Sequence, residues 1–329
     1  MFGYSRFFSY LCTRNLINNK NMITTYRVEP LNYEKVYNNL VEGISKYVKD
    51  CHIETLVIGM SGGIDSTVVA ALCHSAIEKN MPNVILAGFS LPCSTNQSDE
   101  VSAASLAGNE FCTTFDEVNL QSVFDGVEDF CKGVIHNVDP TPISRGNIKA
   151  RLRMITLYDI ASRTKGIVMD TDNLTEHFLG FWTIHGDDGD FNPIGGLWKH
   201  EVYGLAKWMK ENVYKGSKAL EASIAITPTD GNGVKAGGDL AQIAPGKTYD
   251  DVDEILHAWV GLDSRIKPMV VESGYQHGVF KQLCEKHGKD TVEMVIQRSI
   301  RSEFKRCQRP IAIDIFNGSI IEKNGKLIG

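Results

Sequence analysis

Apolar residues recur in two alternating patterns along the first half of the chain. Short, largely β-branched apolar runs predict buried strands at Ile53–Ile58, Asn83–Ser90, Thr114–Leu120 and Gly166–Asp170. Apolar positions at helical spacing predict helices at Tyr33–Asp50, Thr67–Lys79, Gln97–Cys112, Gln121–Val134 and Ser144–Thr164. Strands that alternate with helices predict an α/β fold, a doubly wound parallel sheet with helices on both faces. Ligands bind beyond the carboxyl ends of such strands, where Gly59, Ser90 and Asp170 are expected.

The pattern changes after Asp170. A loop rich in Gly and Asp is expected at Thr183–Gly196, and the long glycine-rich segment Thr227–Lys247 is a candidate lid without regular structure. Further helices are predicted at Trp198–Val213, Tyr249–Val260, Gln276–His287 and Asp290–Cys307. We therefore expect an N-terminal tail at 1–30, one domain at 31–310 with helical C-terminal additions, and a C-terminal tail at 311–329.

Composition narrows the class of protein. Of the 329 residues 43% are hydrophobic and 22% are charged, which is typical of a soluble globular enzyme. The net charge of -6 argues against a protein that coats nucleic acid, and no apolar run is long enough to span a membrane. The eight cysteines form no C-x-x-C pair, which disfavours disulfides and structural zinc and favours a reducing, cytoplasmic location. Residues 1–28 contain basic residues but no Asp or Glu, as in either an organelle-targeting segment or a plain tail.

The octet Gly59-Met60-Ser61-Gly62-Gly63-Ile64-Asp65-Ser66 lies between a predicted strand and a predicted helix. Such a turn presents backbone N–H groups and the positive end of a helix dipole to an anion. Asp65 repels phosphate, so its natural role is to hold a cation that bridges to phosphate. No lysine follows the glycines, which excludes the mononucleotide P-loop, and the spacing does not fit the dinucleotide fingerprint. The octet resembles the pyrophosphate loop of the ATP pyrophosphatases, which split ATP into AMP and pyrophosphate.

Three further stretches carry candidate chemistry. The basic run Gly146–Met154 suits phosphate or carboxylate binding, although a solvated helix face explains it equally. In the run Asp170–Glu176, Asp172 is a candidate helix N-cap, and Glu176 can reach the same metal as Asp65. The run Gly180–Lys199 sets an apolar lip beside an acidic glycine-rich loop, which suits a ligand with a ring and sugar hydroxyls, and it lacks the EF-hand spacing for Ca²⁺.

In this order the stretches resemble ammonia-dependent NAD synthetase from about Tyr33 to Pro310. The resemblance implies amidation of nicotinic acid adenine dinucleotide (deamido-NAD) by ammonia, with ATP as co-substrate and Mg²⁺ as cofactor. It implies Asp65, Lys199 and Glu176 as catalytic residues, and Asp65 and Glu176 as the Mg²⁺ ligands. The implied ATP-binding residues are Gly59, Met60, Ser61, Gly62, Gly63, Ile64, Asp65, Ser66, Asn96, Thr171, Lys199 and Thr229. The implied deamido-NAD-binding residues are Asn147, Arg151, Asp187, Asp190, Phe304 and Lys305.

The chain departs from the family pattern at Ser90, Ile184 and Phe304, where many members carry Arg, Lys and His. The family also implies a homodimer, and Gln121–Val134 and Ser144–Thr164 offer apolar faces for one. The residues before the octet are too few for an amidase domain, so the expected nitrogen source is free ammonia or ammonia delivered by another protein. We expect no nucleic acid or membrane partner. The alternative is a tRNA-modifying ATP pyrophosphatase of the thiolation or lysidine type, which shares Ser-Gly-Gly-x-Asp-Ser.

Overall fold

The computed structural model describes residues 31–134, 138–226 and 239–306. It also describes three two-residue strands, β5 (Ala312–Ile313), β6 (Ile320–Ile321) and β7 (Leu327–Ile328), which form a small antiparallel sheet. The chain divides into two compact units. Among the described residues the larger unit takes 31–174 and 182–250, and the smaller takes 175–181 and those from 251 onward. The prediction of one domain over 31–310 stays a prediction.

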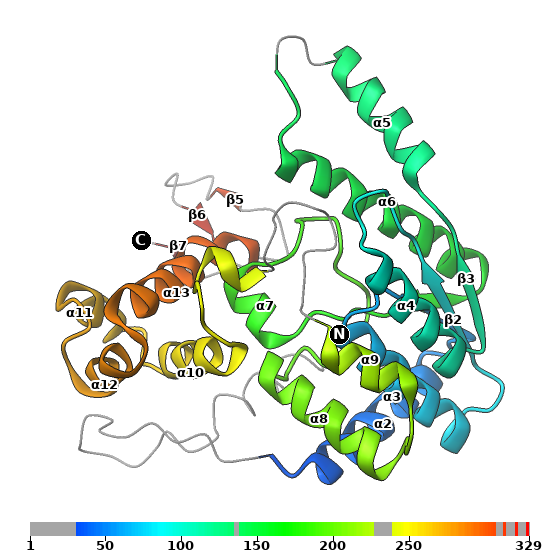
Figure 1. Cartoon of the computed structure of the whole chain (residues 1–329), viewed down its shortest axis with the longest axis horizontal. Helices are drawn as coiled ribbons and strands as arrows, with labels where there is room; N and C mark the ends of the chain where they lie inside the picture. Colours follow the sequence, from blue (N-terminus) through cyan, green and yellow to red (C-terminus); the bar gives the residue numbers. More distant parts are fainter. Residues whose placement is uncertain are drawn as a thin grey trace. The chain divides into compact units, whose positions relative to one another are not determined.

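A four-stranded parallel sheet forms the centre of the larger unit (Figure 1). Its order is β3 (Thr114–Glu117), β2 (Ile85–Ser90), β1 (Thr55–Gly59) and β4 (Gly166–Val168). Side chains of β1 alternate between two cores, with Leu56 and Ile58 on one face and Val57 on the other. Because both faces are covered, the strand reads as a continuous apolar run.

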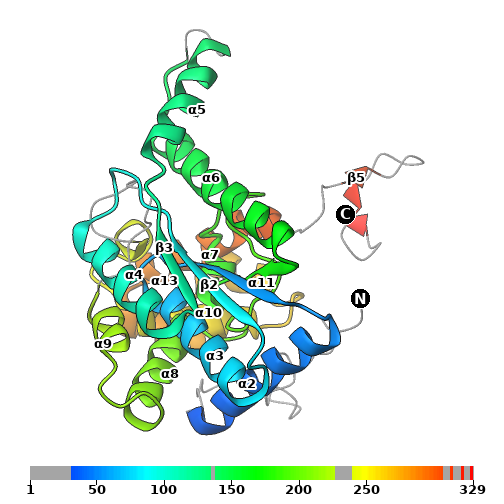
Figure 2. The same ribbon diagram turned by 90° about the vertical axis from the view of Figure 1, so that its right-hand side faces the viewer.

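Helices cover both faces of this sheet. One face carries α2 (Tyr33–Asp50), α3 (Ile64–Asn80), α4 (Ser98–Phe111), α8 (Lys199–Asn212) and α9 (Lys218–Ala225). The other carries α5 (Gln121–Val134) and α6 (Pro142–Arg163). Figure 2 shows α6 lying along the sheet and α5 continuing beyond it. The predicted doubly wound α/β fold is therefore confirmed.

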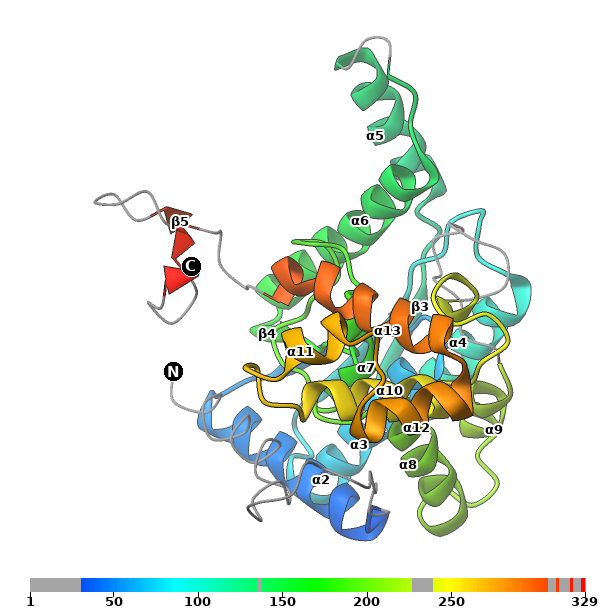
Figure 3. The ribbon, with the colours of Figure 1, turned by 90° about the vertical axis from the view of Figure 1, so that its left-hand side faces the viewer.

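Up to Arg306 the smaller unit is helical. It contains α7 (Leu174–Leu179), α10 (Tyr249–Val260), α11 (Lys267–Glu272), α12 (Gly278–His287), α13 (Lys289–Arg301) and the 3₁₀ turn η2 (Glu303–Arg306), seen together in Figure 3. The first residue of α7 and the first two of α10 still belong to the larger unit. Val292, Val295 and Ile296 on one face of α13 are fully buried, which gives this unit an apolar core of its own.

Several boundaries differ from the sequence prediction. The helix expected at Asp290–Cys307 ends at Arg301 and is followed by η2. The sequence pattern does not predict helices α9 and α11. Within the segment expected to lack regular structure, Asp239–Gln242 forms the 3₁₀ turn η1, and residues 227–238 lie outside the described residues. Among the described helices, none is long and apolar enough to cross a bilayer.

Candidate functional site

The order of the strands places the site. Strands β2 and β3 extend the sheet on one side of β1, whereas β4 lies on its other side. The segments that follow the carboxyl ends of β1 and β4 therefore lead in different directions. In open α/β sheets, ligands bind in the crevice between two such segments. The segment after β1 is the glycine octet, and the segment after β4 is the acidic run that starts at Asp170.

The octet has the backbone of an anion-binding loop. Gly62 has a φ of +84°, and a Cβ there would lie 2.1 Å from the carbonyl oxygen of Glu100, so only glycine fits. Gly63 caps α3 without a side-chain hydrogen bond. The hydroxyls of Ser61 and Ser66 lie 3.1 Å apart beside this cap. Backbone N–H groups of the first helical turn have no intrahelical acceptor and are the donors that a phosphate needs.

Asp65 lies in the first turn of α3, because the helix begins at Ile64 rather than at the predicted Thr67. Its Oδ2 accepts from Lys199 Nζ at 2.5 Å, and its Oδ1 accepts from Asn173 Nδ2 at 2.9 Å. The Lys199 side chain is 3% exposed and that of Asp65 is 15% exposed, so this ion pair is nearly buried. The Lys199 ammonium also lies over the Tyr249 ring, 5.4 Å from its centre. The structure thus joins residues from the ends of β1 and β4 and from the start of α8.

The Asp65 carboxylate fits a divalent cation. Each of its oxygens accepts one of the hydrogen bonds above and keeps a further lone pair, and carboxylate oxygen is the donor that Mg²⁺ prefers. Glu176, the second predicted ligand, lies in α7 and is half-buried in the smaller unit. Sequence reasoning misses Asn173, although it lies three residues before Glu176 in one of the candidate stretches.

Asp190 and Asp170 flank the end of β4. Asp190 Oδ2 accepts from the Val168 N–H at 3.0 Å, and its Oδ1 accepts from the Tyr158 hydroxyl at 3.1 Å. Burial, with Asp190 beside it, raises the pKa of Tyr158 to about 12, so the phenol stays a proton donor. Burial also raises the pKa of Asp170 to about 6, against hydrogen bonds from Asp172 N and Asn192 that favour its charged form. Asp190 thus fixes the local backbone, and its contact with deamido-NAD stays a prediction.

Three of the predicted deamido-NAD residues meet at one turn of the Gly180–Lys199 run. Asn147 Oδ1 accepts from the Thr183 hydroxyl at 3.0 Å, and Asp187 Oδ1 accepts from the Thr183 N–H at 2.7 Å. The exposed Arg151 donates to the Ile184 carbonyl at 2.9 Å. The structure therefore brings Asn147 and Arg151, one turn apart on α6, to the same turn as Asp187.

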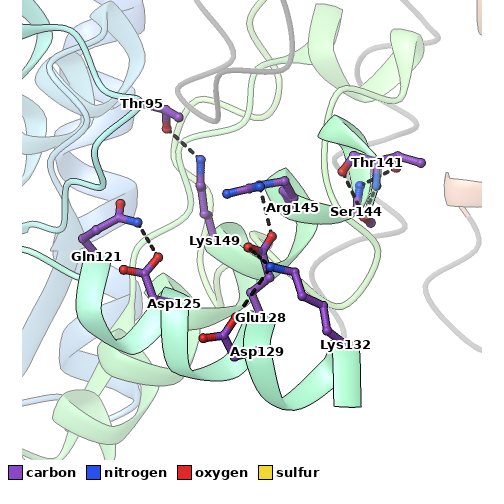
Figure 4. A network of polar contacts seen from close by, with 10 residues as sticks. All are labelled: Thr95, Gln121, Asp125, Glu128, Asp129, Lys132, Thr141, Ser144, Arg145 and Lys149. Atoms are coloured by element: carbon purple, nitrogen blue, oxygen red, sulfur yellow. Dashed lines mark hydrogen bonds and ion pairs between the residues drawn. The ribbon is translucent and has the colours of Figure 1, made fainter. Parts of the chain in front are cut away.

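The turn before α4 is held by cations of α6. Arg153 donates from Nε to the Leu91 carbonyl at 3.0 Å and from Nη2 to Asn96 Oδ1 at 3.1 Å. Lys149 is buried and donates to the Thr95 hydroxyl at 2.8 Å, as Figure 4 shows. Asn96 also accepts from the Cys93 N–H at 3.0 Å. Lys149 and Arg153 therefore shape this turn, and contact between Asn96 and ATP stays a prediction.

A second group of contacts in Figure 4 steadies α5 against α6. The buried Glu128 lies 3.1 Å from Arg145 Nε and 3.1 Å from Lys132 Nζ. Gln121 accepts from the Ser94 N–H at 2.8 Å, which connects the start of α5 to the same turn.

The remaining predicted residues are spread more widely. Thr171 is half-buried just after β4, and Gly59 and Met60 end β1 and begin the loop. In the smaller unit, Phe304 is 54% exposed and Lys305 Nζ donates to the Gly180 carbonyl at 2.7 Å. Thr229 lies outside the described residues.

Comparison with known proteins identifies the family of this chain. The NH3-dependent NAD+ synthetase of Wolinella succinogenes is 30% identical over 282 residues, which cover 85% of this chain and 96% of that protein. The structure of the NH3-dependent NAD synthetase from Campylobacter jejuni superposes with a TM-score of 0.61 at 25% identity, covering 86% of this chain and all of that one. An NMN synthetase structure from Francisella tularensis gives a TM-score of 0.66 at 22% identity, covering 87% of this chain and 100% of that one, and shows the shared fold. The family model described as NAD synthase matches residues 36–308, and the chain belongs to that family.

Proposed function

We propose that this protein makes NAD from deamido-NAD and ammonia with ATP, releasing AMP and pyrophosphate. The observation that carries the proposal is the nearly buried Asp65–Lys199 pair, set behind a loop in which only glycine fits at Gly62. The pair and the loop lie at the carboxyl edge of the sheet, where the segments that follow β1 and β4 separate. This arrangement supplies what adenylation needs, which is a cradle for pyrophosphate and fixed charges beside it.

The reaction needs no covalent nucleophile from the protein. The nicotinate carboxylate attacks the α-phosphorus of ATP, the bond to the bridging oxygen of pyrophosphate breaks, and an acyl-adenylate forms. Ammonia then attacks the acyl carbon, AMP leaves with the bridging oxygen, and loss of a proton gives the amide of NAD. The N–H groups at the start of α3 and the Lys199 ammonium stabilise the leaving pyrophosphate.

We assign Asp65 and Glu176 as the carboxylates that hold Mg²⁺, and this assignment rests on the sequence motifs and on the donor chemistry. When bound, the ion neutralises charge on the phosphate oxygens. Asn147, Arg151 and Asp187, which meet around Thr183, are the proposed contacts of deamido-NAD, together with Asp190, Phe304 and Lys305. Water must be kept from the adenylate, because it would hydrolyse it.

Ammonia as nitrogen donor is supported by the names of the curated relatives at about 30% identity. No observation favours the tRNA-modifying alternative. Sulfur transfer needs reactive thiolates, whereas burial raises the pKa of the Cys112 thiol to about 12 and also raises that of Cys73. All six cysteines among the described residues are free thiols, which supports a reducing, cytoplasmic location.

We also propose a homodimer formed through α5 and α6. Exposed apolar side chains run along these two helices, and they are Val123, Phe130, Val134, Ile143 and Ile155. Phe130 is 72% exposed, and such a concentration of apolar surface is typical of an interface with another protein. A second copy of the chain is the occupant that the family resemblance implies.

The experiment that tests the function measures NAD formed by the purified protein from deamido-NAD, ATP, Mg²⁺ and ammonium. In parallel reactions, glutamine replaces ammonium, or nicotinic acid mononucleotide replaces deamido-NAD. In a further reaction, tRNA replaces both deamido-NAD and ammonium. We expect NAD only with deamido-NAD, and ammonium to be far better than glutamine at the same pH. Pyrophosphate release that depends on tRNA and not on deamido-NAD would contradict the proposal.

A further inference from the structure

Helix α7, which carries Glu176, is too short to keep its conformation by itself. It has six residues, whereas isolated helices below about 12–15 residues are marginal in water. The position of Glu176 therefore depends on the contacts that hold α7 within the smaller unit.

The C-terminal end of α7 is held by side chains of α13, of η2 and of Ser302, which lies between them. Three successive carbonyl groups each accept from them: Phe178 O from Ser302 Oγ at 3.1 Å and Arg306 Nη1 at 3.0 Å, Leu179 O from Arg298 Nε at 2.7 Å, and Gly180 O from Lys305 Nζ at 2.7 Å. The last carbonyls of a helix lack intrahelical partners and form the negative end of its dipole. Cationic donors provide hydrogen bonds to these carbonyls and positive charge near the negative end of the dipole, so these contacts stabilise α7.

The close approach of the two segments requires glycine at Gly180. Its φ is +68°, and a Cβ there would lie 2.4 Å from Ser302 Cβ. The Arg298 guanidinium carbon lies over the Phe181 ring, 5.2 Å from the ring centre. Burial lowers the pKa of Arg298. The Gly180-Phe181 pair, which begins the apolar lip expected from the sequence, thus belongs to the attachment of α7.

The N-terminal end of α7 is attached to α10. The Thr175 hydroxyl donates to Asp253 Oδ1 at 2.5 Å, and the two residues are 0% and 1% exposed. Thr175 immediately precedes Glu176, so this buried contact fixes the backbone next to the proposed metal ligand.

We propose that Arg298 and Asp253 are positioning residues, which hold α7 at its two ends so that the Glu176 carboxylate is preset for Mg²⁺. The inference rests on the proposed metal role of Glu176. Groups that orient a metal ligand commonly change metal affinity when they are removed, by about 10- to 100-fold.

The test measures Mn²⁺ affinity by electron paramagnetic resonance, on the full chain with a non-hydrolysable ATP analogue. We expect Arg298→Met to raise the Mn²⁺ Kd about tenfold or more. Arg298→Lys, which keeps a cationic donor, is expected to restore part of the affinity. Arg301→Met is the matched control, because Arg301 is exposed on the same helix, and its Kd is expected to be that of the unmodified protein. Asp253→Ala is expected to raise the Mn²⁺ Kd as Arg298→Met does. Asp253→Asn keeps an acceptor for Thr175, so it is expected to raise the Kd less.

Circular dichroism establishes that each variant is folded, and Arg298→Gln replaces Arg298→Met if that variant does not fold. A folded Arg298 variant with unchanged Mn²⁺ Kd, alongside a Glu176→Gln variant with a raised Kd, would overturn the positioning role and leave the proposed function intact. An unchanged Kd in Glu176→Gln would overturn the metal assignment itself, and the positioning role with it. NAD formation by the unmodified protein, measured in the same preparation, tests the proposed function separately.

Discussion

The Asp65 carboxylate has two charged partners, the Lys199 ammonium and the proposed Mg²⁺ ion. In the structure it neutralises the buried Lys199 ammonium, and in the proposed reaction it also holds a cation. Removing one partner of a buried ion pair costs about 3–5 kcal/mol, because the other charge is left without compensation. We therefore expect the residue to matter for stability and, in the proposed reaction, for catalysis as well.

Asp65→Asn is expected to lower both kcat and the thermal unfolding midpoint. A lost charge-assisted contact is worth about 1.5–3 kcal/mol, which corresponds to about a 10- to 150-fold loss of rate. The double variant Asp65→Asn/Lys199→Met removes both charges and is expected to recover stability but not activity. Recovery of turnover in the double variant would contradict the proposed catalytic roles of both Asp65 and Lys199.

Asp170 predicts a dependence of stability on pH. Its pKa of about 6 lies above the ordinary value of 3.8, so the folded protein binds a proton that the unfolded chain has lost. The free energy of unfolding should therefore fall as the pH rises from about 4 to 6, by up to about 3 kcal/mol from this group. Chemical denaturation at several pH values measures the fall. The Asp170→Asn variant should show a shallower fall over this range, and equal slopes would contradict the assignment.

At the scale of elements, the loop between β1 and α3 depends on its backbone. At Gly62 both the positive φ and the contact with Glu100 O exclude a side chain. Gly126, in the middle of α5, has no atom within 4 Å of the position that a methyl group would take, so it offers a matched comparison.

Gly62→Ala is expected to destabilise the protein by more than about 1 kcal/mol and to weaken ATP binding. Gly126→Ala is expected to stabilise it by up to about 1 kcal/mol, because alanine has the higher helix propensity. Thermal unfolding and equilibrium binding of ATP measure the two effects. Opposite signs in the stability change are the expected result, and a tolerated Gly62→Ala would show that the loop relaxes readily.

Helices with a long, clear pattern are predictable from sequence, as Tyr33–Asp50 and Tyr249–Val260 show by agreeing at both ends. Short helices such as α9 and α11 escape prediction, because one or two turns contain too few residues for a period to emerge. The start of α3 lies three residues before the predicted one, because glycine and polar residues conceal its first turn. The candidate loop is predictable from its motif, but its pairing with Lys199, 134 residues later, depends on tertiary structure.

For the whole molecule, the apolar surface of α5 and α6 predicts association. Sedimentation at micromolar concentration should give twice the chain mass of 36.5 kDa. Phe130→Ser should shift the protein toward monomer, whereas Met269→Ser, which changes a residue 64% exposed on α11, should not. A fully active monomer in the unmodified protein would contradict the proposed dimer.

The proposed function depends on activation of the deamido-NAD carboxylate by adenylation, and an isotope measurement tests this step. Deamido-NAD with ¹⁸O in its carboxylate is converted with ATP, Mg²⁺ and ammonium, and the products are analysed by mass spectrometry. Because the bridging oxygen of the acyl-adenylate leaves with AMP, we predict one ¹⁸O in AMP and none in pyrophosphate. Unlabelled AMP accompanying NAD, or label in inorganic phosphate with ADP as the other product, would contradict it.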